Sequence, residues 1–167
     1  MASRWRRTLA RLGLVLVVVA GAACGGGAGD GAGWPSVAIE SLAGDPVSSD
    51  ALVADVPTVV TVWAVWCTPC REELPALQAL MEGHDGAVQV VGVNNGDDPG
   101  AAGAFLDSLG VTYTSYRDPQ GLLTSALGVV SLPATLIVLP DGEVAWQHLG
   151  AVSMDEVERR LAPHLAA

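Results

Sequence analysis

Two cysteines three positions apart, Cys67 and Cys70, are the residues of this chain best suited to carry out a reaction. Thiols at this spacing can close a disulfide within the chain and can exchange it with a disulfide of another protein. The exchange proceeds through the thiolate, which the N–H groups and the dipole at a helix N-terminus favour. A strand-like run at 58–63 leads into the pair, and a helix-like segment at 71–81 leads away from it. The sequence therefore predicts a redox-active pair at a strand–helix junction.

Three elements must position this pair. The near-continuous apolar run at 57–65 is typical of a central strand that is buried on both faces. The segment 71–81 has apolar residues at helical spacing, and Pro75 inside it is expected to kink the helix. A second apolar run at 88–93 completes a strand–helix–strand unit, whose strands we expect to be parallel. The apolar residues of the helix are Leu74, Leu77, Leu80 and Met81.

The other elements are short and are separated by turn signals. Two strands, at 37–39 and near Val47, should form an N-terminal hairpin. Asp141-Gly142 favours a second hairpin near the C-terminus, and Ser153 with Glu156 forms a capping box for the last helix. In chain order we expect a helical turn capped by Ser49 and Asp50 and running to Ala54, a polar loop at 94–100, a helix at 101–109, a strand at 111–116, a helix at 122–127, strands at 136–139 and 143–149, and a helix at 153–165.

The first 23 residues have the composition of a signal peptide. Arginines at 4–11 precede an apolar stretch at 12–20, which is too short to span a bilayer as a helix. A run of small residues then ends in Cys24 and resembles the lipobox of bacterial lipoproteins, in which that cysteine is acylated. Gly21 departs from the lipobox, which usually has Leu there. Ordinary cleavage near residues 20–22 is the alternative to lipidation.

Composition limits the class of partner. The chain contains no lysine, and four of its eight arginines lie in the first eleven residues. The net charge of −10 would become −14 after removal of that segment, since four arginines would remain against 18 acidic residues. Such a charge argues against nucleic-acid binding, which needs a basic surface. We assign residues 24–36, rich in Gly and Ala, to a flexible tether and 37–167 to one domain.

The residues around the cysteine pair resemble a known family. Residues 63–75, WAVWCTPCREELP, together with the order of the elements and the later Ser131-Leu132-Pro133, are similar to the TlpA/ResA-like family of thiol–disulfide oxidoreductases. The resemblance implies a thioredoxin-like α/β fold, with a central mixed sheet, helices on both faces, an N-terminal β-hairpin extension and a central αβ insertion. It covers roughly residues 37–165. It also implies an extracytoplasmic, membrane-tethered protein, often a reductant in cytochrome c maturation.

The resemblance assigns roles to individual residues. It implies that Cys67 attacks the substrate disulfide and that Cys70 resolves the mixed disulfide. It implies that Pro133 follows a cis peptide bond and that the backbone of Leu132 pairs with the substrate. The residues that flank the sulfurs and complete the substrate-binding rim are Trp66, Thr68 and Pro69.

One acidic residue is a further catalytic candidate. Glu73 lies one helical turn after Cys70 and could take a proton from it if its carboxylate is partly buried. The alternative is a solvated acid in the first turn of the helix, which is the more plausible reading for Glu72. Thioredoxin itself has a buried acid where this chain has Thr61, and threonine cannot act as a general base.

The sequence thus predicts a disulfide reductase of protein substrates that needs no organic cofactor and no metal. We expect a monomer and a lipid anchor to the membrane, and the family resemblance implies a membrane thiol protein as electron donor. An oxidant or isomerase of secreted proteins is the nearest alternative. A copper carrier using Cys67 and Cys70 is a distant one, because soft thiolates suit Cu(I). A peroxiredoxin is disfavoured, since Ala64 stands where that chemistry has a threonine.

Overall fold

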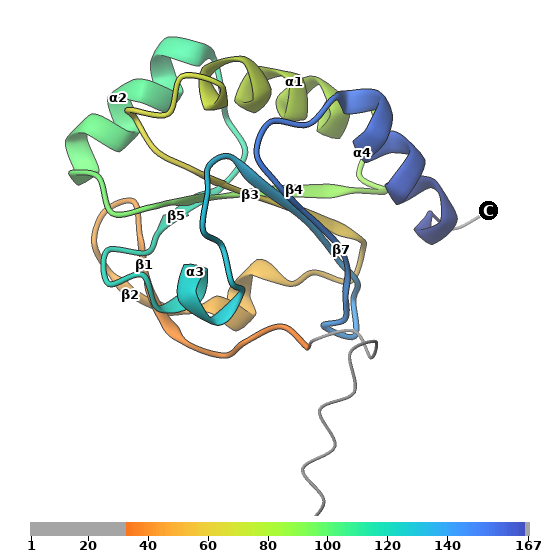
Figure 1. Ribbon diagram of the computed structural model, residues 1–167, viewed down its shortest axis with the longest axis horizontal. Helices are drawn as coiled ribbons and strands as arrows, with labels where there is room; N and C mark the ends of the chain where they lie inside the picture. The colour runs from red at the N-terminus through yellow and green to blue at the C-terminus, as the bar shows by residue number, and fades with distance from the viewer. Residues whose placement is uncertain (1–32, 166–167) are drawn as a thin grey trace, which may run out of the picture. The chain divides into compact units, whose positions relative to one another are not determined.

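The computed structural model describes residues 33–165, and the predictions for the signal segment and for Cys24 lie outside this range. Its centre is one seven-stranded mixed sheet with the strand order β2-β1-β5-β4-β3-β6-β7 (Figure 1). β3 and β4 pair in parallel, β4 and β5 pair in parallel, and the other neighbours are antiparallel. The strands are β1 (Ala38–Ser41), β2 (Pro46–Ser48), β3 (Thr58–Trp63), β4 (Gln89–Asn94), β5 (Ser115–Arg117), β6 (Ala134–Val138) and β7 (Val144–Leu149).

Helices cover both faces of the sheet, as the thioredoxin-like fold requires. Figure 1 shows α1, α2 and α4 along one face and α3 on the opposite face. Two short 3-10 helices, η1 (Ser49–Leu52) and η2 (Ala162–His164), accompany them. The α-helices are α1 (Cys70–Gly83), α2 (Pro99–Leu109), α3 (Leu122–Ala126) and α4 (Met154–Leu161).

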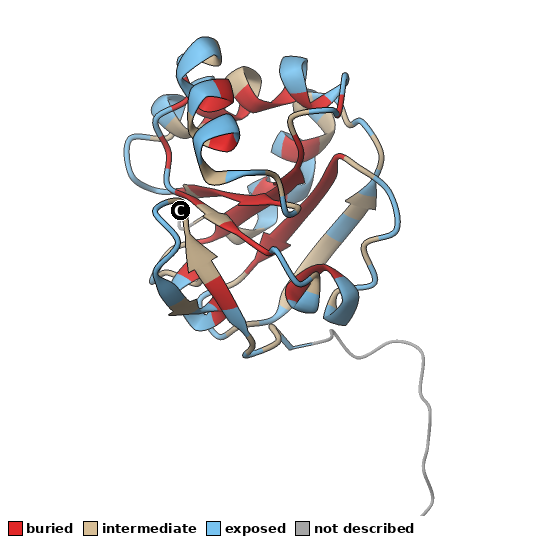
Figure 2. Cartoon of the chain, turned by 90° about the vertical axis from the view of Figure 1, so that its left-hand side faces the viewer, coloured by how far each residue is buried: buried red, intermediate tan, exposed pale blue. Residues whose placement is uncertain are grey.

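The alternation of side chains along β3 creates two cores. Val59 and Trp63 pack into the cluster that contains the buried residues of α1, α2 and α4. Val60 and Val62 point the other way, into a cluster with Leu123 of α3. Every residue of β3 is buried, and Figure 2 shows the buried strands between exposed helix surfaces. Each fully buried side chain of this size stabilises the folded state by about 1.5–3 kcal/mol. β3 therefore holds the start of the loop that follows it in a fixed position.

Several predicted elements begin or end elsewhere; β6, for example, starts at Ala134 instead of residue 136, and α4 ends at Leu161 instead of residue 165. α2 starts at Pro99 instead of residue 101, because Asp98 accepts hydrogen bonds from the first free N–H groups of the helix. The helical turn η1 is capped by Ser48, whereas we predicted Ser49 or Asp50. β5 is confined to Ser115–Arg117, whereas we predicted a strand at 111–116. Before it, the backbone N–H groups of residues 112 and 113 donate to the buried Gln78 side chain of α1, which replaces strand pairing there.

The predicted capping box of α4 is half formed. The Ser153 hydroxyl accepts a hydrogen bond from the N–H of Glu156, as expected. The Glu156 carboxylate instead forms ion pairs with Arg159 and Arg160 of the same helix. Charged partners one turn away therefore compete successfully with the free N–H at the helix start.

Among the described residues, Gly33 and Trp34 already make contacts with the domain, although they lie in the range assigned to the tether. Gly33 forms a β-bridge with Glu143, and the N–H of Trp34 donates to the carbonyl of Gly142 at 2.7 Å. The Trp34 indole also donates to the carbonyl of Ser49 at 2.8 Å. Within residues 33–165, none of the helices has the length and apolar character to cross a bilayer.

Candidate active site

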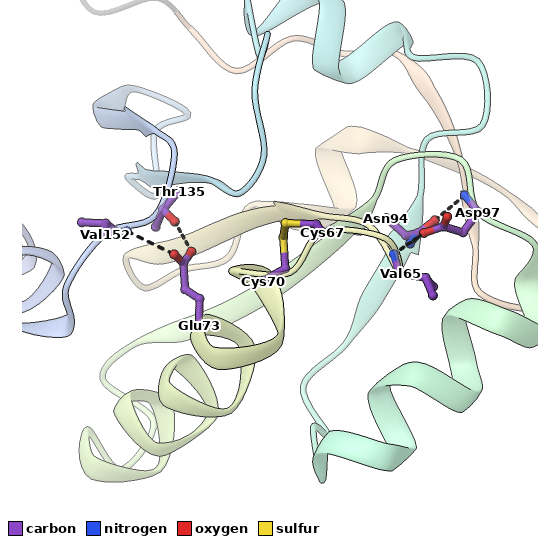
Figure 3. Close-up of a disulfide and its surroundings, with 8 residues drawn as sticks. All are labelled: Val65, Cys67, Cys70, Glu73, Asn94, Asp97, Thr135 and Val152. Atoms are coloured by element: carbon purple, nitrogen blue, oxygen red, sulfur yellow. Dashed lines mark hydrogen bonds between the residues drawn. A yellow bond between two sulfur atoms is a disulfide. The ribbon is translucent and has the colours of Figure 1, made fainter.

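The two cysteines form a disulfide at the junction of β3 and α1 (Figure 3). Cys67 lies in the loop after β3, and its N–H donates to the carbonyl of Ala64 at 3.1 Å. Cys70 is the first residue of α1, one position earlier than the predicted helix start. The two Cα atoms are 5.3 Å apart, within the usual range for a disulfide. The predicted placement of a thiol pair at a strand–helix junction is therefore confirmed.

The two sulfur-bearing residues differ in exposure. Cys67 keeps 3% of its surface exposed and Cys70 keeps none. The residues that flank them are open to solvent, since Trp66 is 67% exposed and both Thr68 and Pro69 are exposed. Both cysteines are therefore buried, and the small surface that the pair keeps exposed belongs to Cys67.

The Leu132–Pro133 peptide bond is cis, as the family resemblance implied. It immediately precedes β6, whose residue Ala134 pairs with Val62 near the end of β3. The cis peptide therefore lies beside the strand end from which the cysteine loop departs. Leu132 is half-buried, and Val130, two positions earlier in the same loop, is 85% exposed. Val130 is thus an exposed apolar side chain in the loop that leads to the cis peptide.

Glu73 is buried beneath the helix start, with only 5% of its surface exposed. Its Oε1 accepts a hydrogen bond from the Thr135 hydroxyl at 2.7 Å, and its Oε2 accepts one from the N–H of Val152 at 3.3 Å (Figure 3). Burial raises the pKa of the Glu73 carboxyl, against smaller opposing effects of Thr135, Val152 and the charge of His148. The solvated alternative thus fails for Glu73, whereas Glu72 is exposed.

The sheet below Glu73 carries a row of buried polar groups. Thr61 pairs with Thr135 across β3 and β6, and no hydrogen bond is shown for its hydroxyl. Burial raises the pKa of the Tyr113 phenol, and the negative charge of Glu73 raises it further. Within the described range, the buried side-chain atoms without a hydrogen-bond partner are Thr61 Oγ1, Trp63 Nε1, Tyr113 OH and Ser115 Oγ. Of the buried polar side chains named here, Glu73 is the one that carries a carboxyl group.

The three histidines lie in different places, at the end of α1, in β7 and in η2. His84 pairs with Glu158 at 3.1 Å, and His148 stacks on Trp146. His164 is in the C-terminal turn η2. Among residues 33–165, no three His, Cys, Asp or Glu side chains are grouped so that they could hold a metal ion.

The sequence missed one group of residues beside the site. Asn94 and Asp97 belong to the predicted polar loop, to which we assigned no role. The Asp97 carboxylate accepts hydrogen bonds from the N–H of Val65 at 2.6 Å and from the Asn94 amide at 2.7 Å (Figure 3). The available signal was their position at the carboxyl end of a parallel strand, where side chains of α/β folds gather around ligands.

Comparison with known proteins gives consistent results. The AhpC/TSA family matches residues 31–147. The thiol:disulfide interchange protein HelX of Rhodobacter capsulatus is 34% identical over 134 residues, which cover 79% of this chain and 74% of HelX.

Two solved structures are similar across the domain. One is a protein from Chlorobium tepidum named as a thiol:disulfide interchange protein DsbE, with a TM-score of 0.73 and 26% identity, covering 83% of this chain and 99% of that one. The other is a secreted Mycobacterium tuberculosis disulfide oxidoreductase homologous to Escherichia coli DsbE, with a TM-score of 0.66 and 27% identity, covering 77% and 96%.

Proposed function

Because the chain belongs to the AhpC/TSA family and is a thioredoxin-fold thiol–disulfide oxidoreductase of the TlpA/ResA-like type, we propose that it reduces disulfides of other proteins outside the cytoplasm. The single observation that carries this proposal is the Cys67–Cys70 disulfide at the start of α1, with an exposed rim on the side of Cys67. Its substrates are proteins with an accessible disulfide, and by the family resemblance they belong to cytochrome c maturation.

The reaction consists of two exchanges. The thiolate of reduced Cys67 attacks one sulfur of the substrate disulfide, a mixed disulfide forms, and the other substrate sulfur leaves as a thiolate and takes a proton. Cys70 then gives up its proton and attacks the sulfur of Cys67, which releases the second substrate thiol. The chain loses two electrons and ends with the disulfide that the structure contains.

Glu73 is suited to accept the proton that Cys70 releases. It lies one turn further along α1, and burial raises the pKa of its carboxyl toward the range in which a general base is effective. Thr61 holds the position of the buried acid in thioredoxin and offers no base there. Glu73 is therefore the proton acceptor that we assign to the resolving step.

The same carboxylate supports reduction as the direction of exchange. A negative charge close to the cysteine pair opposes a second negative charge on either sulfur, so it makes the reduced form less stable. A couple whose reduced form is strongly stabilised is an oxidant, as in DsbA. A couple with the opposite bias is a reductant, which is why we favour reduction over oxidation or isomerisation.

Substitution of the two cysteines tests the assignment. Cys67→Ser should abolish the reduction of insulin disulfides, because it removes the attacking sulfur. Cys70→Ser should retain the attack and accumulate mixed disulfides that non-reducing electrophoresis and mass spectrometry detect. An active Cys67→Ser variant would overturn the role of Cys67, and a Cys70→Ser variant that traps no substrate would overturn that of Cys70.

Location and anchoring are part of the proposal. The signal-like segment and the secreted relative from Mycobacterium tuberculosis support an extracytoplasmic place, and the lipobox-like run supports acylation of Cys24. A lipid anchor would hold the domain beside a membrane thiol donor that re-reduces it. Cys24→Ser should move the protein from the membrane fraction to the soluble fraction, and an unchanged distribution would count against the anchor.

A further inference from the structure

The loop that carries Cys67 is held by a side chain from outside the cysteine motif. Val65 lies two residues before Cys67, and its N–H donates to Oδ2 of Asp97 at 2.6 Å. Asp97 is 32 residues away in sequence, in the loop between β4 and α2. This hydrogen bond fixes the backbone at the point where the chain turns from β3 toward the disulfide.

Asp97 is itself held from several directions. Its N–H donates to the Asn94 side chain at 2.8 Å, while its carboxylate accepts the Asn94 amide at 2.7 Å. Its carbonyl accepts two hydrogen bonds from the guanidinium of Arg117, at 2.8 and 3.1 Å. Arg117 is buried and pairs with Glu40 of β1 at 2.8 Å. The support therefore continues from the sheet, through Asp97, to the active-site loop.

The turn that contains Val65 connects these hydrogen bonds to Cys67. The N–H of Cys67 donates to the carbonyl of Ala64, so residues 64–67 close a single tight turn. The N–H of Asn95 also donates to the carbonyl of Trp63 at 2.8 Å, which attaches the same two loops a second time. A movement of Val65 would therefore displace Trp66 and Cys67 together, and in-line attack on a disulfide depends on that position.

We propose that Asp97 is a positioning residue for disulfide exchange, whose carboxylate fixes the backbone of Val65 and thereby the loop that presents Cys67. The inference rests on the proposed function. In this proposal the Asp97 carboxylate acts through its hydrogen bonds and not through its charge. A substitution can separate these two effects. An amide oxygen in the place of Oδ2 accepts the same two N–H groups, so Asp97→Asn keeps the bonds and loses the charge.

Four variants test the proposal through the rate of insulin-disulfide reduction and the pH midpoint of Cys67 alkylation. Asp97→Ala should lower the rate about tenfold or more and shift the midpoint, because the sulfur leaves its place at the helix start. Asp97→Asn should restore the rate to within about threefold of the wild type by keeping both hydrogen bonds. Asp98→Ala and Asp98→Asn are matched controls, because Asp98 caps α2 without contacting Val65 and loses the same charge.

A measurement on the wild-type protein tests the proposal even if a variant does not fold. The Val65 amide proton should exchange with solvent at least about 100-fold more slowly than in an unstructured chain, because it is hydrogen-bonded. Free exchange of this proton would overturn the proposal. So would an Asp97→Ala variant with wild-type rate and midpoint, or an Asp97→Asn variant as slow as Asp97→Ala. Failure of the wild type itself to reduce insulin would count against the proposed function, whereas the Cys67 alkylation data would still test Asp97.

Discussion

At the scale of single residues, Glu73 should affect both disulfide exchange and the stability of the fold. It is a carboxyl group buried beside a thiol pair, held by the Thr135 hydroxyl and the N–H of Val152. Both contacts favour the charged form, yet burial outweighs them and raises the pKa. The group therefore takes up a proton more readily in the folded chain than in the unfolded chain.

The stability of the protein should depend on pH through Glu73. Since its pKa is raised on folding, the folded state binds more protons, and its favourable contribution is complete below the ordinary carboxyl pKa and lost as pH rises through the raised value. Glu73→Gln cannot ionise and does not lose this contribution. As pH rises from 4 to 8, the free energy of unfolding of the variant should therefore increase relative to that of the wild type, by at most about 1.4 kcal/mol per pH unit.

Urea unfolding at a series of pH values would measure this difference. The matched control is Glu72→Gln, on the exposed side of the same helical turn, which should follow the wild-type profile. Parallel profiles for Glu73→Gln and the wild type would contradict the raised pKa.

The sequence revealed some of these residues and not others. Cys67, Cys70 and Pro133 were recognisable because their types and spacing form a motif. The burial of Glu73 depends on residues 62 and 79 positions later in the chain, and the sequence left it open. The position of Asp97 after a parallel strand was a signal for a role near the site, but its hydrogen bond to Val65 could not be predicted, because a backbone N–H carries no signature in the sequence.

At the scale of elements, β3 and β6 place two threonines side by side, and their hydroxyl groups differ in hydrogen bonding. Thr61 and Thr135 pair across the strands and are both fully buried. Thr135 donates to Glu73, whereas no hydrogen bond is shown for the Thr61 hydroxyl. The same residue type in the same environment thus provides an internal comparison of a paired and an unpaired hydroxyl.

Replacing each threonine with valine should give opposite results. Thr61→Val removes an unpaired hydroxyl without changing the shape of the side chain, so the free energy of unfolding should stay the same or rise by up to about 2 kcal/mol. Thr135→Val deprives the buried carboxylate of a partner and should lower it by about 1–3 kcal/mol at pH 8, and by less at pH 4, where Glu73 is protonated.

Denaturant unfolding of both variants at the two pH values would check this pair of predictions. Equal losses at Thr61 and Thr135 would contradict the hydrogen-bonding pattern. A loss at Thr135 that is the same at pH 4 and pH 8 would contradict its connection to the charge of Glu73.

Element boundaries show where local patterns stop being sufficient. The helix start at Pro99 could have been predicted, since Asp98-Pro99 is a common cap followed by a favoured first residue. The late start of β5 could not, because Gln78 occupies the N–H groups of residues 112 and 113 from another element. Long-range hydrogen bonds of this kind leave no periodic signal.

At the scale of the whole molecule, the fold was predictable because its parts are strongly patterned. The buried runs of β3 and β4, the apolar stripe of α1 and the Asp141-Gly142 turn between β6 and β7 all point to one arrangement. The thioredoxin-like architecture then brings the cis peptide and the cysteine loop to one end of the central strands. Figure 3 shows Glu73 on the helix that begins at this loop. The protein is a reductant if the groups around the two sulfurs disfavour negative charge on them.

The reduction potential of the Cys67–Cys70 couple tests that claim most directly. It is measured by equilibrating the protein with glutathione and dithiothreitol buffers and counting alkylated cysteines. Known proteins of this chemistry range from about −270 mV for thioredoxin to about −120 mV for DsbA. We predict a value more negative than about −200 mV, on the reducing side of this range. A less negative value would mean that the reduced pair is stabilised, and it would contradict the assignment of this protein as a reductant.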